Sequence, residues 1–338
     1  MIQKNKRIAI VILNYNGIKL LKKFLASVVN FSDKKISSIY LIDNFSTDES
    51  IKYVKKKFPS IRIIKNKINL GYAEGYNKGL ELIKSDYYIL LNSDVEVTKN
   101  WLNPLFNLME SDNNIVACQP KILSYNKKDY FEYAGASGGF IDKLGYPFCR
   151  GRIFDTIEKD SGQYDNKIQV FWASGCCLMI RSDIFHKLGG FDNYFFAHME
   201  EIDLCWRINN LNLKIYCEPK SKIYHLGNQT LNKSNPTKTY LNFRNNLIMI
   251  LKNDHFINLI WKLPTRLILD FFAFLRFFMK KESRKHGISI LKSYRDFILD
   301  FKFNYSKRNK IIGESSMIYK NLITIKYYIQ NIKKFNDL

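Results

Sequence analysis

The chain has 338 residues, of which 46% are hydrophobic, so it is not disordered overall and can bury a core as one large domain or as one domain plus an extension. With 53 Lys and Arg against 31 Asp and Glu, its net charge of +22 favours anionic partners: phosphorylated small molecules, a membrane surface or nucleic acid. Six cysteines without a CxxC pair argue against zinc and a disulfide framework, and they fit a reducing compartment.

The chain begins with strands and helices in alternation. The apolar run Ile8–Leu13 is too short for a signal-peptide core or a membrane span, and its continuity predicts a buried parallel strand. The turn Asn14-Tyr-Asn-Gly17 leads into a helix predicted over residues 18–30. Residues 38–42 and 61–64 predict two further strands.

A polar segment, Asp43-Asn-Phe-Ser-Thr-Asp-Glu-Ser50, follows the second strand. We expect Ser46 or Thr47 to cap the next helix, because hydroxyl side chains bind the free N–H groups of helix N-termini. Asp48 and Glu49 would then lie in its first turn, where acidic residues favour the helix dipole.

Three glycines spaced four apart follow the third strand, in Asn69-Leu-Gly71-Tyr-Ala-Glu-Gly75-Tyr-Asn77-Lys-Gly79. This spacing is not the GxGxxG of a dinucleotide site. On a helix it gives a smooth face, which allows close approach either to a sheet or to a ligand.

The strand 87–91 ends in Asn92-Ser93-Asp94 and resumes as Val-Glu-Val. Ligands of open α/β sheets bind outside the carboxyl ends of the strands, and a carboxylate there can hold a divalent cation that in turn holds a diphosphate. The alternative for Asp94 is a solvated turn residue. Strand–helix alternation through residue 97 predicts a parallel, right-handed α/β half.

The middle of the chain is less regular. We predict a helix at 101–109, a strand at 115–118 and a loop-rich insertion at 124–168 that shapes an acceptor site. A strand with a polar break is expected at 170–180, followed by a short helix that Arg181-Ser-Asp183 caps and Gly189-Gly190 ends.

An acidic cluster follows in Phe191-Asp192 through Glu200-Glu201-Ile-Asp203-Leu-Cys-Trp-Arg207. On a helix Glu200, Asp203 and Arg207 share one face, and we interpret Asp203 with Arg207 as a structural i,i+4 ion pair. Glu201 falls on the apolar face, where partial burial raises the pKa of a carboxyl group and suits it to act as a general base.

His225 ends a short strand in front of Gly227. A single histidine in such a place can be a structural residue or part of a site, and its position alone leaves both interpretations open.

Four motifs stand in a familiar order: Asn14-Tyr-Asn-Gly17; Asp43-Asn-x-Ser-Thr-Asp48; Asn69-x-Gly71 to Asn77-x-Gly79 with Leu91-Asn-Ser-Asp94; and Gly189-Gly-Phe-Asp192 with Glu200-Glu-Ile-Asp-Leu-Cys205. Together they resemble the bacterial family 2 glycosyltransferases of the rhamnosyltransferase type, over about residues 7 to 250. The resemblance implies the GT-A fold: a Rossmann-like, mostly parallel sheet flanked by helices, here with a C-terminal helical extension.

The resemblance also implies inverting transfer of a sugar from a nucleoside-diphosphate donor, dTDP-rhamnose or a UDP-sugar, to a hydroxyl of a glycan or lipid-linked acceptor. Asp43 would contact the donor base, Asp94 and His225 would hold Mg²⁺ or Mn²⁺ at the diphosphate, and Glu201 would be the catalytic base. The other implied donor-binding residues are Asn14, Asn16, Ser46, Asn69, Gly71, Asn77 and Asn92. Acceptor or supporting positions would be Trp172, Gly175, Glu200 and Asp203.

The chain departs from the family pattern at two positions. Asn92 replaces the first carboxylate of the Asp-x-Asp motif, and an amide is a weaker metal ligand. The base position holds Glu201 rather than an aspartate, so its carboxylate reaches one methylene further.

The C-terminal third, predicted as a separate region 251–338, is basic and aromatic. Residues 240–338 contain 19 Lys and Arg against 7 Asp and Glu, a net charge of +12. The apolar stretch 256–279 contains Pro264 and charges at 262, 266, 270 and 276, so a membrane span is not expected. An interfacial element drawn to anionic lipid and a helical subdomain packed on the core both remain open.

Two other classes compete with the transferase. A non-catalytic nucleotide- or nucleic-acid-binding protein would fit the charge but has no recognisable nucleic-acid motif, so we expect no nucleic-acid partner. A nucleotidyltransferase would require a Gly-rich basic phosphate loop after the first strand, and Asn14-Tyr-Asn-Gly17 is not one. We expect a cytoplasmic enzyme of cell-surface polysaccharide synthesis at the inner face of the plasma membrane.

Overall fold

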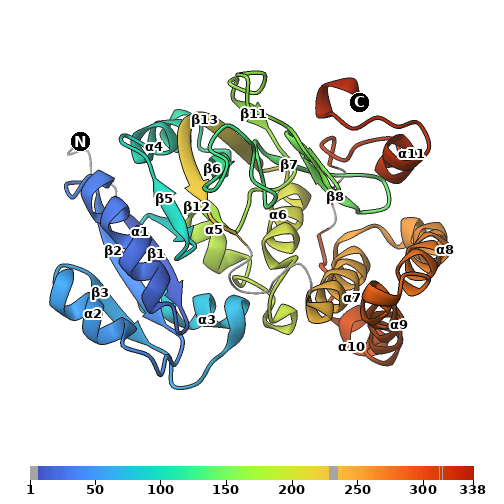
Figure 1. The fold of residues 1–338 in the computed structure, drawn as a ribbon, viewed down its shortest axis with the longest axis horizontal. Coiled ribbons are helices and arrows are strands. Elements are labelled where there is room, and N and C mark those ends of the chain that lie inside the picture. Colours follow the sequence, from blue (N-terminus) through green and yellow to red (C-terminus); the bar gives the residue numbers. More distant parts are fainter. Residues whose placement is uncertain (1–6, 228–234, 312, 314) are drawn as a thin grey trace.

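The protein is described by a computed structural model of residues 7–227, 235–311, 313 and 315–338. A nine-stranded sheet forms its centre, in the order β11-β13-β6-β12-β4-β1-β2-β3, with β5 paired to β13 (Figure 1). The pairs β1–β2, β1–β4, β2–β3 and β6–β13 are parallel, whereas β12 runs antiparallel to both of its neighbours. The pairs β11–β13 and β5–β13 are antiparallel as well, so four of the eight pairings are parallel and four are antiparallel. The expected α/β class is confirmed; the sheet is mixed, and its parallel part is the half formed by β4, β1, β2 and β3. Its strands are β1 Ile8–Asn14, β2 Ser37–Asp43, β3 Arg62–Lys65, β4 Tyr87–Leu91, β5 Val95–Val97, β6 Ile115–Ser124, β11 Ile168–Gln169, β12 Cys177–Arg181 and β13 Lys214–His225.

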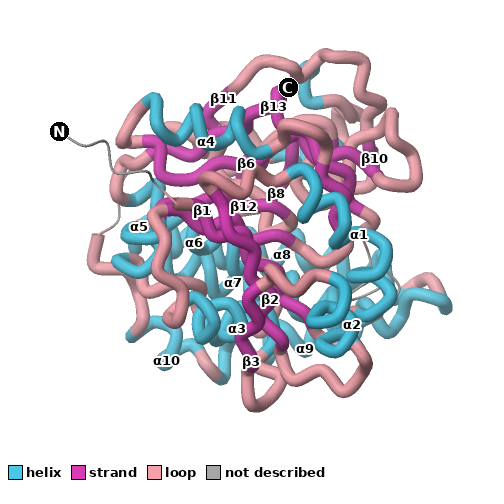
Figure 2. The backbone as a smooth tube through the Cα atoms, turned by 90° about the vertical axis from the view of Figure 1, so that its left-hand side faces the viewer, coloured by secondary structure: helices cyan, strands magenta, loops and turns pink. Residues whose placement is uncertain are grey.

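Helices cover both faces of the sheet because its central strands are apolar on both sides (Figures 1 and 2). In β1, Ile10 and Ile12 face the core beneath α1, α2 and α4, whereas Val11 faces the core beneath α3, α5 and α6. These helices are α1 Ile18–Phe31, α2 Ser50–Lys57, α3 Gly71–Leu80, α4 Leu102–Ser111, α5 Ser182–Lys187 and α6 Glu200–Asn210.

The glycine-spaced helix α3 packs closely on the sheet. A Cβ atom at Gly79 would lie 2.1 Å from Ile42, and one at Gly75 would lie 3.2 Å from Leu13 and Asn44. The interpretation of these two glycines as a close-packing face is therefore supported.

Two local predictions were wrong. The helix expected after Ser46 and Thr47 begins only at Ser50, because the Ser46 hydroxyl binds the β1 loop instead of capping a helix. The strand expected over 170–180 is formed only from Cys177 to Arg181, and the residues before it form a turn.

The insertion expected to be loop-rich contains a second sheet of four short strands, in the order β10-β9-β8-β7. They are β7 Gly139–Ile141, β8 Pro147–Cys149, β9 Arg152–Ile153 and β10 Thr156–Ile157. Their brevity explains why hydrophobic periodicity did not reveal them.

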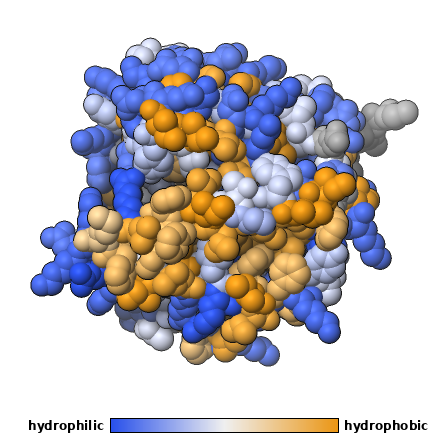
Figure 3. All heavy atoms as spheres, turned by 90° about the vertical axis from the view of Figure 1, so that its right-hand side faces the viewer, coloured by the Kyte–Doolittle hydropathy of each residue, from blue (hydrophilic) through white to orange (hydrophobic). Residues whose placement is uncertain are grey.

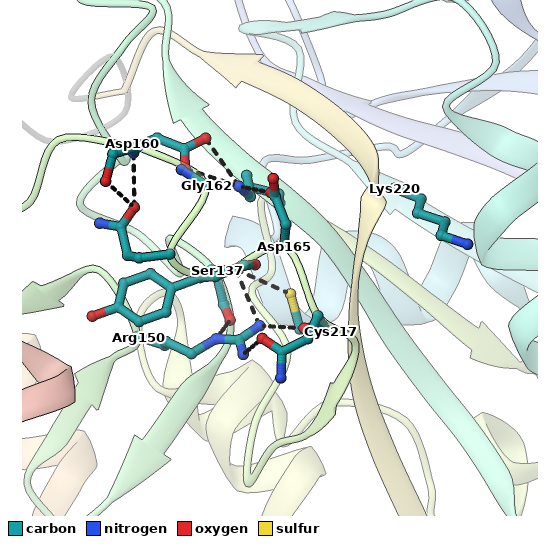
Figure 4. Close-up of polar contacts among 12 residues, drawn as sticks. Ser137, Arg150, Asp160, Gly162, Asp165, Cys217 and Lys220 are labelled. Atoms are coloured by element: carbon teal, nitrogen blue, oxygen red, sulfur yellow. Dashed lines mark hydrogen bonds and ion pairs between the residues drawn. The ribbon is translucent and has the colours of Figure 1, made fainter.

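Buried charges fasten this insertion to the large sheet (Figure 4). The ammonium of Lys121, on β6, has no exposed surface and binds Asp160 at 2.9 Å as well as Asp165. Within the insertion, Arg150 donates to the carbonyl oxygens of Ser137 and Asn166, each at 3.0 Å. A buried, paired charge is costly to break, so the Lys121 ion pairs hold the insertion against β6 and the Arg150 contacts hold its loops together.

The C-terminal region is helical, as predicted, and packs beside the sheet (Figure 1). Its core is continuous with the main one, since Leu247, Leu259 and Phe297 belong to the same apolar cluster as Val11. The predicted boundary at residue 250 falls in the last turn of α7, and the division into two domains remains a prediction. The helices are α7 Pro236–Asn253, α8 Phe256–Phe278, α9 Arg284–Leu299, α10 Phe301–Ser306 and α11 Ile323–Tyr328. Over the described residues, no helix combines the length and apolarity that crossing a membrane requires.

Candidate active site

The predicted donor-binding residues gather where β1 and β2 end. Asn14 and Asp43 are register partners in these parallel strands, and the Asn14 amide donates to Asp43 Oδ1 at 3.3 Å and to Ser46 Oγ at 3.0 Å. Ser46 Oγ also accepts the Asn16 backbone N–H at 2.9 Å. The polar segment after β2 is therefore tied to the end of β1 at this edge of the sheet.

Asn44 joins the end of β2 to the start of α3, a role that its place in the Asp43-Asn44 pair does not reveal. Its amide nitrogen donates to Asn69 Oδ1 and to the Gly71 carbonyl oxygen, both at 2.9 Å. Asn69 Oδ1 accepts the Gly71 N–H at 3.0 Å. Gly71 has φ +74°, and a Cβ atom there would meet Phe196 at 2.6 Å, so only glycine fits this tight turn.

Asn77 has a different position from the one predicted. Its amide oxygen accepts the Phe191 N–H at 3.0 Å and its amide nitrogen donates to the Phe191 carbonyl oxygen at 2.8 Å. Both amide groups thus bind one backbone residue, which joins α3 to the segment leading to the acidic cluster. Asn77 is better explained as this bridge than as a direct donor contact.

Asp94 and His225 lie side by side because β5 pairs with the end of β13, with Val95 opposite His225. Asp94 Oδ1 and His225 Nε2 are 3.1 Å apart, and Asp94 Oδ2 accepts the Gly227 N–H at 3.1 Å. Gly227 has φ +69°, and a Cβ atom there would lie 2.8 Å from Glu132. The predicted pairing of Asp94 with His225 is present in the geometry.

Glu132 completes this group, and it was not predicted because it lies in the irregular insertion. Its Oε2 atom is 3.2 Å from Nδ1 of His225, so the imidazole lies between two buried carboxylates. Burial opposes protonation of His225, but Cys176, Glu132 and Asp94 raise its pKa well above the ordinary value. Burial opposes ionisation of Asp94 and Glu132, yet His225 lowers the pKa of both carboxyl groups.

Glu200 and Glu201 begin α6 in the opposite electrostatic setting. Glu200 is buried and Glu201 half-buried, and within the described residues Oε2 of neither has a hydrogen-bond partner. Burial raises the pKa of both carboxyl groups, and the adjacent Glu201 raises that of Glu200 further. The expected inward placement of Glu201 and the direction of its pKa agree with the structure.

A strained turn presents these two glutamates. His198 and Met199, just before α6, have left-handed φ angles of 69° and 74°. The buried amide of Asn245, on α7, donates to the carbonyl oxygens of Ala197 at 2.9 Å and His198 at 2.8 Å. Such backbone conformations persist only where the surroundings fix them. Asn245 thus determines where α6 begins.

The turn 174–176 connects the two carboxylate groups. The Asn92 N–H donates to the Cys176 carbonyl oxygen at 3.0 Å on the Asp94 side. On the other side, the Tyr72 hydroxyl donates to the Gly175 carbonyl oxygen at 2.7 Å, and a Cβ atom at Gly175 would lie 3.6 Å from that of Glu201. Gly175, predicted near the acceptor, therefore lies against the candidate base.

The remaining predicted residues support the site from behind. Asp203 is fully buried; it accepts Arg207 Nε at 2.9 Å and Asn253 Nδ2 at 2.7 Å, which confirms the predicted ion pair. Trp172 is only 3% exposed and donates to the Phe140 carbonyl oxygen at 3.0 Å. The Trp172 side chain therefore offers almost no exposed surface to an acceptor, and its packing on the small sheet explains its position.

Comparison with known proteins agrees with this architecture. Residues 9–189, more than half of the chain, match the sequence profile described as glycosyl transferase family 2. The chain is 26% identical over 240 residues to an N-acetylglucosaminyl-diphospho-decaprenol L-rhamnosyltransferase of Mycobacterium tuberculosis, covering 65% of this chain and 76% of that protein. It is 24% identical over 246 residues to the low-salt glycan biosynthesis hexosyltransferase Agl10 of Haloferax volcanii, covering 71% and 74%.

Solved structures show the same fold at low sequence identity. GalNAc-T7, crystallised with UDP, GalNAc and Mn²⁺, superposes with a TM-score of 0.59 at 17% identity; the match covers 91% of this chain and 60% of that one. The mannosyltransferase PcManGT of Pyrobaculum calidifontis, in complex with GDP-Man and Mn²⁺, gives 0.54 at 11% identity and covers 88% of both chains. The GT-A fold and the glycosyltransferase class are thus confirmed, and the two competing classes are not favoured. The chain belongs to glycosyl transferase family 2.

Proposed function

We propose that this enzyme transfers a sugar from a nucleoside-diphosphate donor to an acceptor hydroxyl, with inversion at the anomeric carbon and with a divalent metal. The observation that carries the proposal is the opposite setting of two carboxylate groups joined by the turn 174–176. Asp94 and Glu132 are paired with His225, whereas Glu200 and Glu201 each have one carboxylate oxygen that no hydrogen-bond donor of the described residues reaches. Carboxyl groups whose pKa values are driven apart at one site divide the work of binding a cation and taking a proton.

Asn14, Asn16, Asp43 and Ser46 form the wall we assign to the donor base and ribose. Asp43 is only 4% exposed but lies at the carboxyl end of β2, where open α/β sheets bind nucleotides. Asn69 and Gly71, fixed by Asn44, form the facing wall. Asn92 is half-buried and directly follows β4, two residues before Asp94.

Asp94 and His225 fit a divalent cation at the diphosphate. Their facing atoms are 3.1 Å apart, and a cation bound there would take the place of the ring proton. No cluster of three or more His, Cys, Asp or Glu side chains arranged for a metal occurs in the part of the chain that the structure describes. Two protein ligands with diphosphate oxygens and water is the usual arrangement for Mg²⁺ or Mn²⁺ at a nucleotide. When bound, such a cation neutralises charge on the leaving diphosphate.

Glu201 is assigned as the general base. It is the more exposed of the two glutamates, and its raised pKa keeps it a competent proton acceptor near neutral pH. It would remove the proton from the acceptor hydroxyl as that oxygen attacks the anomeric carbon from the face opposite the diphosphate. Holding both substrates in line supplies much of the remaining acceleration.

The relatives, a rhamnosyltransferase acting on a diphospho-decaprenol and a glycan hexosyltransferase, support a choice of donor and acceptor. A dTDP-rhamnose or UDP-sugar donor and a glycan or lipid-linked acceptor in cell-surface polysaccharide synthesis are the substrates we propose. With such an acceptor, the enzyme would work in the cytoplasm, at the inner face of the plasma membrane. We further propose that residues 1–250 carry the transferase and that 251–338 form an accessory helical region.

A transfer assay tests this function. Purified enzyme, supplied with each sugar nucleotide, Mn²⁺ and a short lipid- or aryl-linked sugar acceptor, is expected to release one nucleoside diphosphate. The glycosidic product should have the anomeric configuration opposite to that of the donor, as read by NMR. A product with retained configuration would overturn the inverting mechanism and the base role of Glu201.

A further inference from the structure

Helix α8 has an unusual distribution of side chains: three of its four charged residues are buried, whereas most of its large apolar residues are exposed. The buried positions are Leu259, Lys262, Arg266 and Asp270, which recur every three or four residues and form one stripe. The opposite side exposes large apolar residues. They are Phe256, Ile257, Ile260, Trp261, Leu267, Ile268, Phe271, Phe272, Phe278 and Met279.

The charged residues of the buried stripe contact other parts of the protein. Arg266 stacks 3.8 Å from the Tyr146 ring and donates to the Leu144 carbonyl oxygen at 2.9 Å. Asp270 accepts the hydroxyl groups of Tyr146 at 2.6 Å and Tyr294 at 2.7 Å. These contacts fix the rotation of α8, so its apolar side cannot turn inward without leaving buried charges unpaired.

The exposed apolar side is continuous over the length of the helix. A helix of 23 residues is about 35 Å long. Figure 3 shows apolar side chains gathered over this face of the molecule. Isolated exposed apolar residues are ordinary, but a contiguous stripe of this length indicates a contact surface. We name this stripe, with the ten residues listed above, the α8 face.

Cations surround the α8 face. Lys280, Lys281, Arg284 and Lys285 follow its C-terminal end and are exposed. At the other end, Trp261 lines a surface hollow together with Lys143, Lys320 and Lys326. Tryptophan and lysine are the residue types that anchor proteins at the boundary between lipid tails and headgroups.

We propose that the α8 face docks flat on an anionic membrane surface. This inference deepens the proposed peripheral location. The apolar stripe would enter the boundary of the acyl chains, and the surrounding cations would contact phosphate headgroups. A second copy of the chain suits the face less well, since a twofold interface sets the same cations against one another.

Flotation of the full-length protein with vesicles tests the proposal. At low salt the protein is expected to float with phosphatidylcholine vesicles containing phosphatidylglycerol and to bind pure phosphatidylcholine more weakly. The triple variant Ile257→Ser/Ile268→Ser/Phe272→Ser replaces exposed side chains only and should lose at least about tenfold in vesicle binding. The control Ile68→Ser/Leu82→Ser, exposed elsewhere, should bind as the wild type does.

Three results would overturn the docking surface: no flotation of the wild type, equal flotation of the triple variant, or a wild-type dimer in sedimentation velocity that the triple variant disperses. Nucleoside-diphosphate binding and transfer to a water-soluble acceptor separate this outcome from failure of the proposed function. Both should be unchanged in the triple variant if only docking is lost.

Discussion

Two groups of carboxylates lie on either side of the turn 174–176, and they differ in what surrounds them. Asp94 and Glu132 are buried against His225, which lowers the pKa of both carboxyl groups despite burial. Glu200 is buried and Glu201 half-buried, no cationic side chain among the described residues pairs with either, and burial raises the pKa of both carboxyl groups. The contrast teaches that burial alone does not decide the state of a carboxyl group; the presence of a counter-charge does.

Removing the carboxylate of Glu201 should have the largest effect. Glu201→Gln keeps the shape of the side chain but cannot accept a proton, so transfer should fall by about 10²–10⁴-fold. Steady-state transfer rates at saturating donor measure this. The matched control is Glu200→Gln, which changes the neighbouring carboxyl group and should cost much less. A larger loss for Glu200→Gln would exchange the roles of the two glutamates.

Asp94→Asn should disrupt the group that Asp94 and Glu132 form with His225. It removes the anionic partner of His225 and a proposed metal ligand, so metal-dependent affinity for a nucleoside diphosphate should fall by about 100-fold or more. Titration calorimetry with and without Mn²⁺ measures this loss. Equal affinity in the variant would remove Asp94 from the metal site.

Asn245→Ala should displace Glu200 and Glu201, although Asn245 itself does not contact substrate. Losing the two hydrogen bonds to the turn 197–198 frees α6 to shift, and a displacement of about 1 Å can cost about 100-fold in kcat. The donor KM should stay near the wild-type value, and stability should drop by about 1–3 kcal/mol. A purely structural role would lower stability and leave kcat of the folded fraction unchanged.

Glu132→Gln should show what the second carboxylate beside His225 contributes to the metal site. The carboxylate behind a metal-binding histidine orients the ring, and its loss typically lowers metal affinity by about 10–100-fold. The Mn²⁺ concentration giving half-maximal activity should rise accordingly, whereas kcat at saturating Mn²⁺ should stay close to that of the wild type. A fall in kcat that excess Mn²⁺ does not restore would contradict this role.

The pH dependence of the transfer rate should report the ionisation of Glu201. Glu201 acts as a base only when deprotonated, and its pKa is raised by burial. Transfer should therefore decline as pH falls, starting above the ordinary range of a glutamate, by at most about tenfold for each pH unit. An acid limb at the ordinary glutamate pKa would indicate a solvated base.

The pH dependence of stability should run in the opposite direction from that of transfer activity. The folded pKa of Glu200 lies above its unfolded value, so the folded state holds a proton that the unfolded state releases. Its contribution to the free energy of unfolding is present at acid pH and lost as pH rises through the folded pKa. Urea midpoints of wild type and Glu200→Gln should therefore diverge as pH rises, with the variant the more stable.

Sequence patterns predicted the parallel half of the fold well, because strands such as Ile8–Asn14 are apolar on both faces and end in polar motifs. They also indicated Asp94, Glu201 and His225, which lie at ends of regular elements. Glu132 and Asn245 were missed, because neither has a local signature and the contact that gives each its place in the site is with a residue distant in sequence. Pattern alone also could not reveal that the charges interrupting 256–279 turn inward, since Arg266 and Asp270 find their partners in a loop and in α9.

The division of roles between the two carboxylate groups is tested most directly by the thermal shift of wild type, Asp94→Asn and Glu201→Gln with UDP, dTDP, GDP and CDP, each with and without Mn²⁺ or Mg²⁺. At about 100 times its dissociation constant a ligand stabilises by about 2.7 kcal/mol. One nucleoside diphosphate should stabilise wild type and Glu201→Gln equally and only with metal, and should leave Asp94→Asn unchanged. Stabilisation that requires neither the metal nor Asp94, or that Glu201→Gln abolishes, would contradict the account.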